Sequence, residues 1–432
     1  MNSRKVFNNA KWIVLCRIGQ SLLQLLIGMI TARYLGPANY GLIGYAGSVT
    51  AFALPLMQLG LQSTLIQEMI ETPEEEGKIM GTALMMDLIS GLFCMGMVCL
   101  FVTVANPGET ETLIVCALYS ISLLVRALEL MQQWFQYKLA SKYSSIVMLM
   151  AYIAVSAYKI FLLATAKSIY WFALVNALDY GISGAALIVI YRRIGGQKLT
   201  FAWPMVKRLF RRSKYYILAA MMVTVFQNTD HVMLKMISGD AENGFYTAAV
   251  TCTVICQFVY TAITDSMRPV ILECKKNGSA EYEKNVSRLY GITTYMALAQ
   301  GIAFSLLAKL IVSVLYGAEY AAAVPVLRII VWQIGFSFMG SVRNMWILAE
   351  GKQQLVWKLN LCGAVLNVAG NALLIPQWGA CGAAMASLAT QCFTNFVLGF
   401  VIKPLRPNNH LLLKGLNPRV VGEIAFKMLK RK

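Results

Sequence analysis

Residues 80–104 read MGTALMMDLISGLFCMGMVCLFVTV, a stretch in which Asp87 is the one charged side chain. Roughly twenty residues of helix, at ~1.5 Å each, cross the ~30 Å hydrocarbon core of a bilayer. The stretch therefore predicts a transmembrane helix. The chain around it is equally apolar: of 432 residues, 58% are hydrophobic and 13% charged, and the mean hydropathy is +0.60. In a soluble chain about a quarter of the residues would be charged. The composition therefore predicts a protein that lies mostly in the lipid bilayer.

Apolar stretches of similar length recur along the whole chain and predict about twelve transmembrane helices. Their approximate bounds are 12–34, 40–66, 80–104, 113–137, 143–166, 169–191, 215–237, 245–267, 289–315, 323–348, 355–375 and 380–402. The basic N-terminus leads directly into the first of them, which is longer than the apolar core of a signal peptide and has no small-residue cleavage site. We therefore expect a retained first helix.

The formal net charge of +18 is concentrated in alternate loops. Lys and Arg crowd the segments 138–142, 192–214, 268–288 and 403–432, whereas the intervening loops carry acidic residues such as Glu109, Asp240 and Glu319. Short cytoplasmic loops accumulate cations, so both termini are expected in the cytoplasm. Anionic lipid and topology account for this charge, and no nucleic-acid motif is present, so no nucleic-acid partner is expected. The acidic segment 68–78 is an exception among the loops expected on the cytoplasmic side, and we interpret it as a solvated turn or a short amphipathic segment.

The ten cysteines lie almost entirely inside apolar runs, without a C-x-x-C pair, and are interpreted as small buried residues. Only two histidines are present, His231 and His410, so neither a metal site nor a histidine-based catalytic dyad is expected. No cofactor is expected either.

The basic segment 192–214 falls near the middle of the chain and separates six predicted helices from six. We expect an N-terminal lobe at 1–191, a cytoplasmic linker at 192–214, a second lobe at 215–403 and a cytoplasmic tail at 404–432. An internal repeat supports two lobes, because LGPANYGLIGYA resembles ISGDAENGFYTAA, with Gly36 and Gly41 matching Gly239 and Gly244. The predicted fold class is an all-α membrane protein whose two six-helix lobes enclose a central cavity.

Four stretches carry a resemblance to a known family: ARYLGPANYGLIGYAGSVTAFALPLMQLGLQSTLI at 32–66, QNTDHVMLKMISGDAENGFYTAA at 227–249, LYGAEYAAAVPVLRI at 315–329 and IPQWGACGAAMASL at 375–388. With the helix spacing they resemble the Wzx-type polysaccharide or O-antigen flippases of the multidrug/oligosaccharidyl-lipid/polysaccharide exporter superfamily. The resemblance implies a MATE-like fold in the inner membrane and translocation of an undecaprenyl-diphosphate-linked oligosaccharide by alternating access. It implies as partners this lipid-linked glycan, membrane lipid and other polysaccharide-assembly proteins.

A charged side chain at mid-membrane costs roughly 2.5 to 3.5 kcal/mol, so each one needs a partner, a hydrated cavity or a function. A diphosphate headgroup needs cations, and arginine binds phosphate through two parallel hydrogen bonds. Arg17 is the first candidate, because Gln20 and Gln24 extend a polar stripe on the same helix; the alternative is that it reaches to the interface. The full set of expected substrate-binding cations in the cavity is Arg17, Arg126, Lys159 and Arg343.

Two of the other three cations have a competing interpretation. Arg126 is three residues from Glu129, a spacing that also suits a structural ion pair. Lys159 lies near the outer end of its helix and could extend to the interface. Arg343, beside Asn344, is interpreted as a substrate or gating residue.

Polar residues in the seventh and eleventh predicted helices complete the candidate site. Asp230 and Asn228 are candidates for coupling or gating, with a structural pair to a neighbouring helix as the alternative for Asp230. Asn360, Asn367 and Asn371 share one helical face and are candidate contacts for sugar hydroxyls. The alternative for these amides is hydrogen bonding between helices.

Two other functions stay open. A multidrug/cation antiporter of the same superfamily has the same number of helices, but its cavity would be led by carboxylates. A membrane enzyme of the polysaccharide pathway, such as a polymerase or ligase, usually has a large outer loop, whereas the outer loops here are short. We therefore expect a transporter and no catalytic residues.

Overall fold

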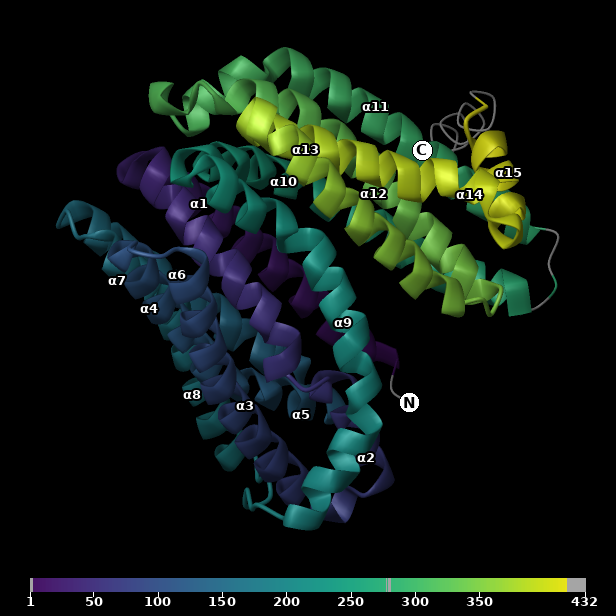
Figure 1. Ribbon diagram of the computed structural model, residues 1–432. Helices are drawn as coiled ribbons and strands as arrows, with labels where there is room; N and C mark the ends of the chain where they lie inside the picture. The colour runs from purple at the N-terminus through teal and green to yellow at the C-terminus, as the bar shows by residue number, and fades with distance from the viewer. Residues whose placement is uncertain (1–2, 277, 279–280, 418–432) are drawn as a thin grey trace. The chain divides into compact units, whose positions relative to one another are not determined.

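The computed structural model describes residues 3–276, 278 and 281–417, with the backbone alone for 3–15, 17, 18, 219, 255, 256, 258 and 262. The described chain is built of α-helices, short 3-10 turns and one π-helical segment (Figure 1). Contacts divide it into two compact units, unit 1 at Met1–Met236 and unit 2 at Ile237–Lys432. The all-α fold class predicted from the sequence is confirmed.

Unit 1 is a bundle in which α1 packs against α3, α4 and α6, and α8 packs against α4 and α6. The span of α4 continues through a 3-10 turn, η3 (Ala127–Leu130), into α5. The helices of this unit are α1 Ser3–Met57, α2 Leu65–Glu71, α3 Glu76–Ala105, α4 Thr110–Arg126, α5 Met131–Tyr137, α6 Ser141–Ala164, α7 Ile169–Ala173, α8 Val175–Arg193 and α9 Trp203–Ser238, whose last two residues pass into unit 2.

Unit 2 has α12 at its centre, packed against α10, α11 and α13. A π-helical segment, η5 (Phe393–Val397), joins α13 to α14 and also contacts α12. The helices of this unit are α10 Asp240–Lys276, α11 Glu281–Leu315, α12 Ala323–Ala349, α13 Gln354–Cys392, α14 Leu398–Val401 and α15 Arg406–Gly415.

Within the described residues, nine helices are long and apolar enough to cross a membrane, or ten if the two parts of α10, bent by 42°, form one span. The predicted number of about twelve is higher because α1 and α13 each cover two predicted spans. Gly36 in α1 and Gly379 in α13 have non-helical backbone angles, and each lies between two predicted spans. How many times the chain crosses the bilayer therefore depends on these two kinks, and twelve stays a prediction.

Gly36 and Gly239, the first pair of matching glycines in the repeat, both have a positive φ angle. Their φ angles are 71° and 91°, a region that only glycine enters without a steric penalty. Gly36 interrupts α1, and Gly239 separates α9 from α10. The short sequence match thus has a counterpart in local structure, which supports the internal repeat.

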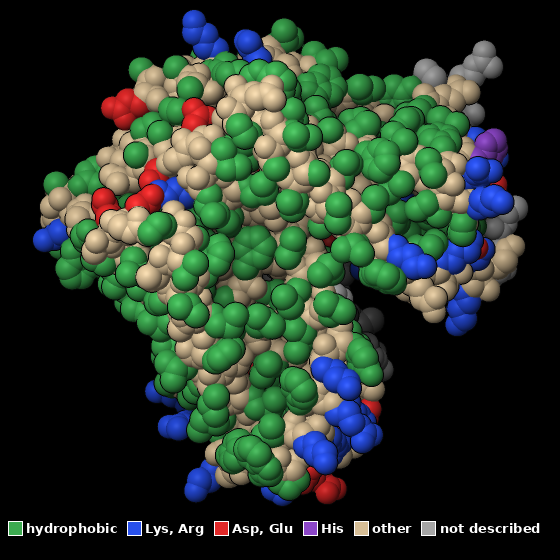
Figure 2. Space-filling model, viewed as in Figure 1, with side chains coloured by type: hydrophobic (Ala, Val, Ile, Leu, Met, Phe, Trp, Pro, Cys, Tyr) green, Lys and Arg blue, Asp and Glu red, His purple; other side chains and the backbone are tan. Residues whose placement is uncertain are grey.

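Large apolar side chains are exposed along the long helices, as expected for contact with lipid. On α3, Ile89, Leu92, Phe93 and Leu100 are each more than 60% exposed. Figure 2 shows apolar side chains over much of the viewed face, with Lys and Arg gathered at the end of unit 1 that carries α2 and the first turns of α9. This distribution is typical of a multi-pass membrane protein.

The acidic segment 68–78 is not a solvated turn, the first of our two interpretations of the sequence. It begins in the short helix α2, on which Met69 is buried and Glu71 is exposed. The Glu68 side chain is fully buried and lies 2.8 Å from Arg208 and 2.7 Å from Arg212 on α9. Glu76 is also buried, and one of its oxygens lies 2.7 Å from Lys138 Nζ. The carboxylates of this segment therefore hold α9 and the end of α5 by ion pairs, because the basic segments fold back onto them.

These contacts place the start of α9 in unit 1. Leu209 and Met205 are buried in the same apolar cluster as Leu65 and Met69 of α2. The chain thus divides near residue 236, whereas the sequence suggested a linker at 192–214 with the second lobe starting at 215. The functional lobe boundary stays a prediction.

We expect replacement of Gly382 with alanine to destabilise unit 2. A Cβ atom there would overlap the Leu374 carbonyl and lie 2.9 Å from the Ile375 nitrogen, and backbone atoms cannot rotate away as a side chain can. Overpacking of this kind costs about 1–3 kcal/mol. The measurement is the apparent unfolding temperature in detergent, with Gly96→Ala as control because a Cβ at Gly96 meets nothing within 4 Å. Equal unfolding temperatures for the two variants would contradict the packing shown here.

Candidate functional site

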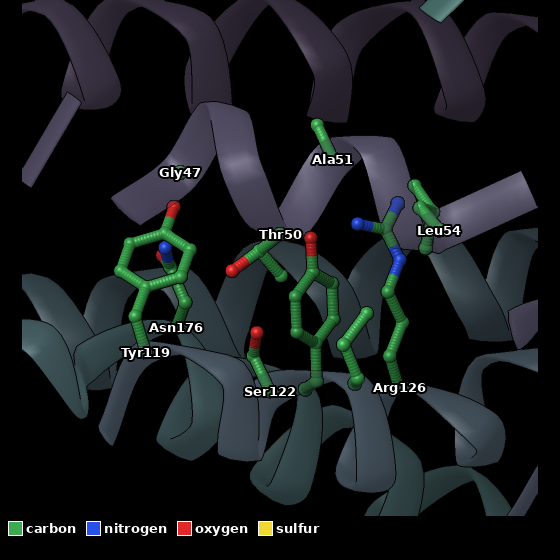
Figure 3. Close-up of a pocket in the computed structure, with 10 residues that line it drawn as sticks. Gly47, Thr50, Ala51, Leu54, Tyr119, Ser122, Arg126 and Asn176 are labelled. Atoms are coloured by element: carbon green, nitrogen blue, oxygen red, sulfur yellow. The ribbon is translucent and has the colours of Figure 1, made fainter. Parts of the chain in front are cut away.

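A small polar cavity lies inside unit 1 between α1, α4 and α8. Its volume is about 80 Å³. Figure 3 shows Tyr119 and Ser122 pointing from α4 toward Gly47 and Thr50 of α1, and Arg126 pointing toward the same helix beside Leu54. We call it the arginine cavity, and its lining residues are Gly47, Thr50, Ala51, Leu54, Tyr119, Ser122, Leu123, Arg126, Asn176 and Tyr180.

Arg126 is the cation of this cavity and is held from two sides. Its Nε donates a 2.8 Å hydrogen bond to a carboxylate oxygen of Glu129, and its guanidinium carbon lies 4.7 Å from the centroid of the Tyr180 ring. The residue stands where α4 gives way to η3 inside the span Thr110–Tyr137. A 3-10 segment inside a span often marks a hinge, and this one brings Glu129 against Arg126.

A second and larger cavity adjoins the first through Asn176 and Tyr180, which line both. Its volume is about 210 Å³. Amide, hydroxyl and phenol groups dominate its wall, so we call it the glutamine cavity. Its lining residues are Gln20, Gln24, Glu129, Gln132, Met148, Tyr152, Asn176, Asp179, Tyr180 and Ser183.

The charges around the glutamine cavity are unevenly placed. Both charged residues of its wall, Glu129 and Asp179, are carboxylates. Their counter-charges lie outside the wall: Arg126 pairs with Glu129, and Lys159 on α6 interacts electrostatically with Asp179. The two cations therefore offset part of the negative charge of the carboxylates, and among the described residues the wall of the glutamine cavity carries carboxylate, amide and hydroxyl groups but no cation.

The first candidate, Arg17, is on α1, and its side chain lies outside the described residues. Gln20 and Gln24, the rest of the polar stripe predicted with it, both line the glutamine cavity. The structure therefore brings Arg126 and the two glutamines close to a common space. The role of Arg17 stays a prediction.

Arg343 is placed differently, in the interior of unit 2. It is only 3% exposed, and it donates hydrogen bonds to the Thr394 carbonyl at 2.6 Å and to the Asn344 side-chain oxygen at 3.2 Å. Thr394 belongs to η5, and a π-helical turn alters the usual backbone hydrogen bonds. These contacts are those of a residue that joins α12 to η5, and its role as a substrate or gating cation stays a prediction.

The coupling candidates lie on the second half of α9. Asp230 is 5% exposed, and Asn228 donates a 3.0 Å hydrogen bond to the Thr224 carbonyl one turn earlier. Neither lines the two cavities described above. Lys235, on the same helix, pairs with Glu109 at 2.8 Å, so α9 is held to unit 1 by ion pairs near both of its ends.

The three asparagines of α13 have different surroundings. Asn367 and Asn371 are buried; Asn371 donates to Asn367 at 3.2 Å, and Asn367 donates to the Ser387 hydroxyl at 3.4 Å. Ser387 follows the kink at Gly379, so this chain of hydrogen bonds links the two halves of α13. Asn360 is partly buried. Sugar contact by these residues stays a prediction.

Several residues that line the two cavities were not predicted as site residues from the sequence. Asn176, Asp179, Tyr180 and Ser183 fall at intervals of three and four residues on α8, which places them on one helical face. This polar spacing in an apolar helix was a detectable signal. The sequence contained no such signal for Tyr119 and Tyr152, because tyrosine is common in membrane helices and its presence does not indicate which way the side chain points.

The Lys235–Glu109 pair predicts a pH dependence of stability. The hydrogen bond from Lys235 holds the pKa of the Glu109 carboxyl below its ordinary value. The pair therefore stabilises the fold fully at pH values above the ordinary carboxyl pKa of ~4.3. This contribution to stability is lost as the pH falls through the lowered pKa. Glu109→Gln should therefore unfold at a lower temperature than the native protein at pH 7, and the difference should shrink below about pH 4. Glu109 is 46% exposed, so we expect at most about 1 kcal/mol.

The control for this pH series is Glu111→Gln, because Glu111 is exposed and only two residues away. It should follow the native protein at every pH. A Glu109→Gln curve that stays parallel to the native curve down to pH 3 would contradict the assignment.

Long apolar helices around polar cavities define a multi-pass membrane protein, and comparison with solved structures identifies the fold. The fold is similar to that of lipid II flippase MurJ in an inward closed conformation (TM-score 0.71, 12% identity, 94% of this chain and 90% of that one). It is also similar to that of an inward-facing multidrug resistance MATE family transporter of the MOP superfamily (TM-score 0.67, 13% identity, 91% and 96%). The class is thus a multi-pass membrane protein with a fold similar to those of these two proteins.

The family follows from sequence. Residues 6–275 match the model described as Polysaccharide biosynthesis protein, and the chain belongs to this family. A curated relative, Capsular polysaccharide biosynthesis protein CapF of Staphylococcus aureus, is 20% identical over 400 residues, 89% of this chain and 96% of its own. An uncharacterised membrane protein of Methanocaldococcus jannaschii, MJ1068, is 22% identical over 232 residues, 50% and 45%. The family resemblance inferred from the sequence is confirmed.

Proposed function

We propose that this protein moves an undecaprenyl-diphosphate-linked oligosaccharide across the cytoplasmic membrane by alternating access, for the synthesis of a surface polysaccharide. The proposal is supported by the family, by CapF, whose name refers to capsular polysaccharide biosynthesis, and by a fold similar to that of a lipid II flippase. The basic loops support an orientation with both termini in the cytoplasm.

The observation that carries the proposal is the position of Arg126 inside a membrane span, at the wall of a polar cavity. A cation at that depth is unfavourable unless it has a partner or a function. Glu129 is its partner in this structure and accepts one hydrogen bond from the Nε of Arg126. A diphosphate could replace that carboxylate, because guanidinium binds phosphate oxygens with the same planar geometry.

The glutamine cavity fits the other part of such a substrate. Its amides, phenols and hydroxyls are the groups that hydrogen-bond sugar hydroxyls, and it adjoins Arg126 through Tyr180 and Glu129. We infer that the diphosphate lies beside Arg126 with the first sugar next to it, while the polyprenyl chain remains in lipid.

A multidrug/cation antiporter is the second candidate, and the carboxylates Glu129 and Asp179 favour it, since a cationic drug or a coupling cation would be attracted to them. Arg126 is itself a cation at the wall of the adjoining cavity, where it would repel a cationic drug and attract a diphosphate. Because the family and CapF also refer to polysaccharide biosynthesis, we prefer the lipid-linked glycan. An enzyme of the pathway is disfavoured because the relatives with this fold are a flippase and a transporter.

The test compares cells that lack the protein with cells complemented by it. The amount of undecaprenyl-linked oligosaccharide in each leaflet is measured together with sensitivity to cationic drugs. We expect the lipid-linked glycan to accumulate on the cytoplasmic face in the absence of the protein and to return to normal on complementation. An unchanged leaflet distribution with altered drug sensitivity would favour the antiporter, and normal flipping with failed polymerisation would favour an enzyme.

A further inference from the structure

We propose that the glutamine cavity is a subsite for a single uncharged sugar ring and discriminates against acidic sugars such as uronates. This inference rests on the proposed function and adds the charge class of the glycan. It is carried by the wall of the cavity, in which both charged residues are carboxylates and the remaining polar groups are neutral.

The size of the cavity suits one small group. Whole ligand sites usually have volumes of about 300–1,000 Å³, whereas the volume of this cavity is about 210 Å³. The adjoining arginine cavity is smaller still, at about 80 Å³. The pair therefore accommodates one sugar ring next to an anionic group.

Three neutral hydrogen-bonding groups come from different helices and converge on this space. Gln24 extends from α1, Gln132 from α5 and Asn176 from α8. A primary amide both donates and accepts, so it can bind a sugar hydroxyl in either direction. Tyr152 and Tyr180 add apolar ring faces, against which the C–H face of a sugar can pack.

The carboxylates set the charge preference. Gln132 donates a 3.3 Å hydrogen bond to Glu129, and Glu129 also accepts from Arg126 at 2.8 Å. Asp179 has its electrostatic partner, Lys159, outside the wall. The hydroxyl groups of an uncharged sugar can donate hydrogen bonds to these oxygens, whereas a uronate would bring a third carboxylate into a space of low dielectric.

The experiment measures binding to the full-length protein in lipid nanodiscs. Three probes are compared: farnesyl diphosphate, the same lipid diphosphate linked to N-acetylglucosamine, and the same lipid diphosphate linked to glucuronate. We expect the N-acetylglucosamine probe to bind at least about tenfold more tightly than the glucuronate probe, since adjacent like charges oppose binding. The sugar-free probe should fall between them.

Two variants assign the preference to this cavity. Asp179→Asn removes one negative charge at nearly the same volume and should narrow the difference between the two sugar probes at least about threefold, mainly by tighter binding of glucuronate. Gln132→Leu removes an amide without changing the charge. It should weaken binding of the N-acetylglucosamine probe and leave binding of farnesyl diphosphate unchanged. This variant still tests the proposal if Asp179→Asn fails to fold. Glu74→Gln, at an exposed carboxylate outside the cavity, should retain the native difference.

Equal affinity for the two sugar probes, or tighter binding of glucuronate, would overturn the inference while leaving the proposed function intact. A native difference that neither Asp179→Asn nor Gln132→Leu changes would also overturn it, because the preference would then arise elsewhere. Failure of all three probes to bind, in a folded protein, would instead count against a lipid-diphosphate substrate and hence against the proposed function.

Discussion

Replacement of Arg126 with alanine is expected to reduce transport of the lipid-linked glycan at least tenfold. The guanidinium is the cation of the arginine cavity, 28% exposed at the side chain and directed by Glu129 and Tyr180. Removing it leaves a diphosphate without its charge partner in a site of low dielectric. Arg126→Lys should recover only part of the activity, because an ammonium cannot form two parallel hydrogen bonds to phosphate.

The competing explanation is that Arg126 only stabilises unit 1 by pairing with Glu129. The double variant Arg126→Ala/Glu129→Gln separates the two roles, because it removes the carboxylate that the single variant leaves unpaired. We expect the double variant to recover the unfolding temperature and not the transport. The measurements are leaflet-resolved lipid-linked glycan in cells and apparent unfolding temperature in detergent.

The matched control is Arg193→Ala, since Arg193 is exposed at the end of α8 and outside both cavities. It should transport as the native protein does. Native transport by Arg126→Ala at an equal protein level would show that the cavity cation is dispensable, and recovery of transport in the double variant would assign Arg126 to the ion pair alone.

Replacement of Glu68 with lysine is the change expected to affect stability most. The Glu68 side chain is 0% exposed, and its two oxygens face Arg208 and Arg212 at 2.8 and 2.7 Å. A lysine would bury a third cation against these two, and an uncompensated buried charge costs about 3–5 kcal/mol. The expected result is loss of the folded protein or a strongly lowered unfolding temperature.

A second substitution at the contact between Glu68 and Arg208 should restore part of the lost stability. Arg208→Glu combined with Glu68→Lys restores opposite charges across the contact and should recover part of the unfolding temperature. Glu74→Lys introduces the same charge at an exposed position three residues beyond Glu71 and should have little effect. If Glu68→Lys and Glu74→Lys unfold alike, the buried ion pairs do not hold α9 against α2.

The sequence predicted some parts of the candidate site through local spacing. Arg126 and Glu129 are three residues apart, so any helical turn brings them close, and the ion pair that we gave as the alternative to substrate binding is present at 2.8 Å. Gln20 and Gln24 were identified as one stripe for the same reason. The partners across helices were not predictable, because the direction of Asp179, Tyr180 or Tyr152 depends on how α6 and α8 rotate against α1.

The contacts of the acidic segment 68–78, outside the membrane spans, were likewise not predictable from the sequence. Its charges suggested a solvated turn, since nothing in a single segment indicates that another segment will cover it. In the folded unit the first turns of α9 return to α2, and Arg212 lowers the pKa of Glu71 by a hydrogen bond. A contact between residues about 140 positions apart is a property of the packed helices.

By itself the sequence determined the solvent, the helices and the family, because the length of an apolar run, the placement of Lys and Arg and short matching stretches are all local. Tertiary structure alone decided which charged residues on different helices meet. It placed Arg126 at a cavity wall, Arg343 against the Thr394 carbonyl, and Glu68 beneath two arginines. The physical reason is that burying a charge is favourable only when a partner from another helix arrives in the right geometry, and that geometry exists only after the helices have packed.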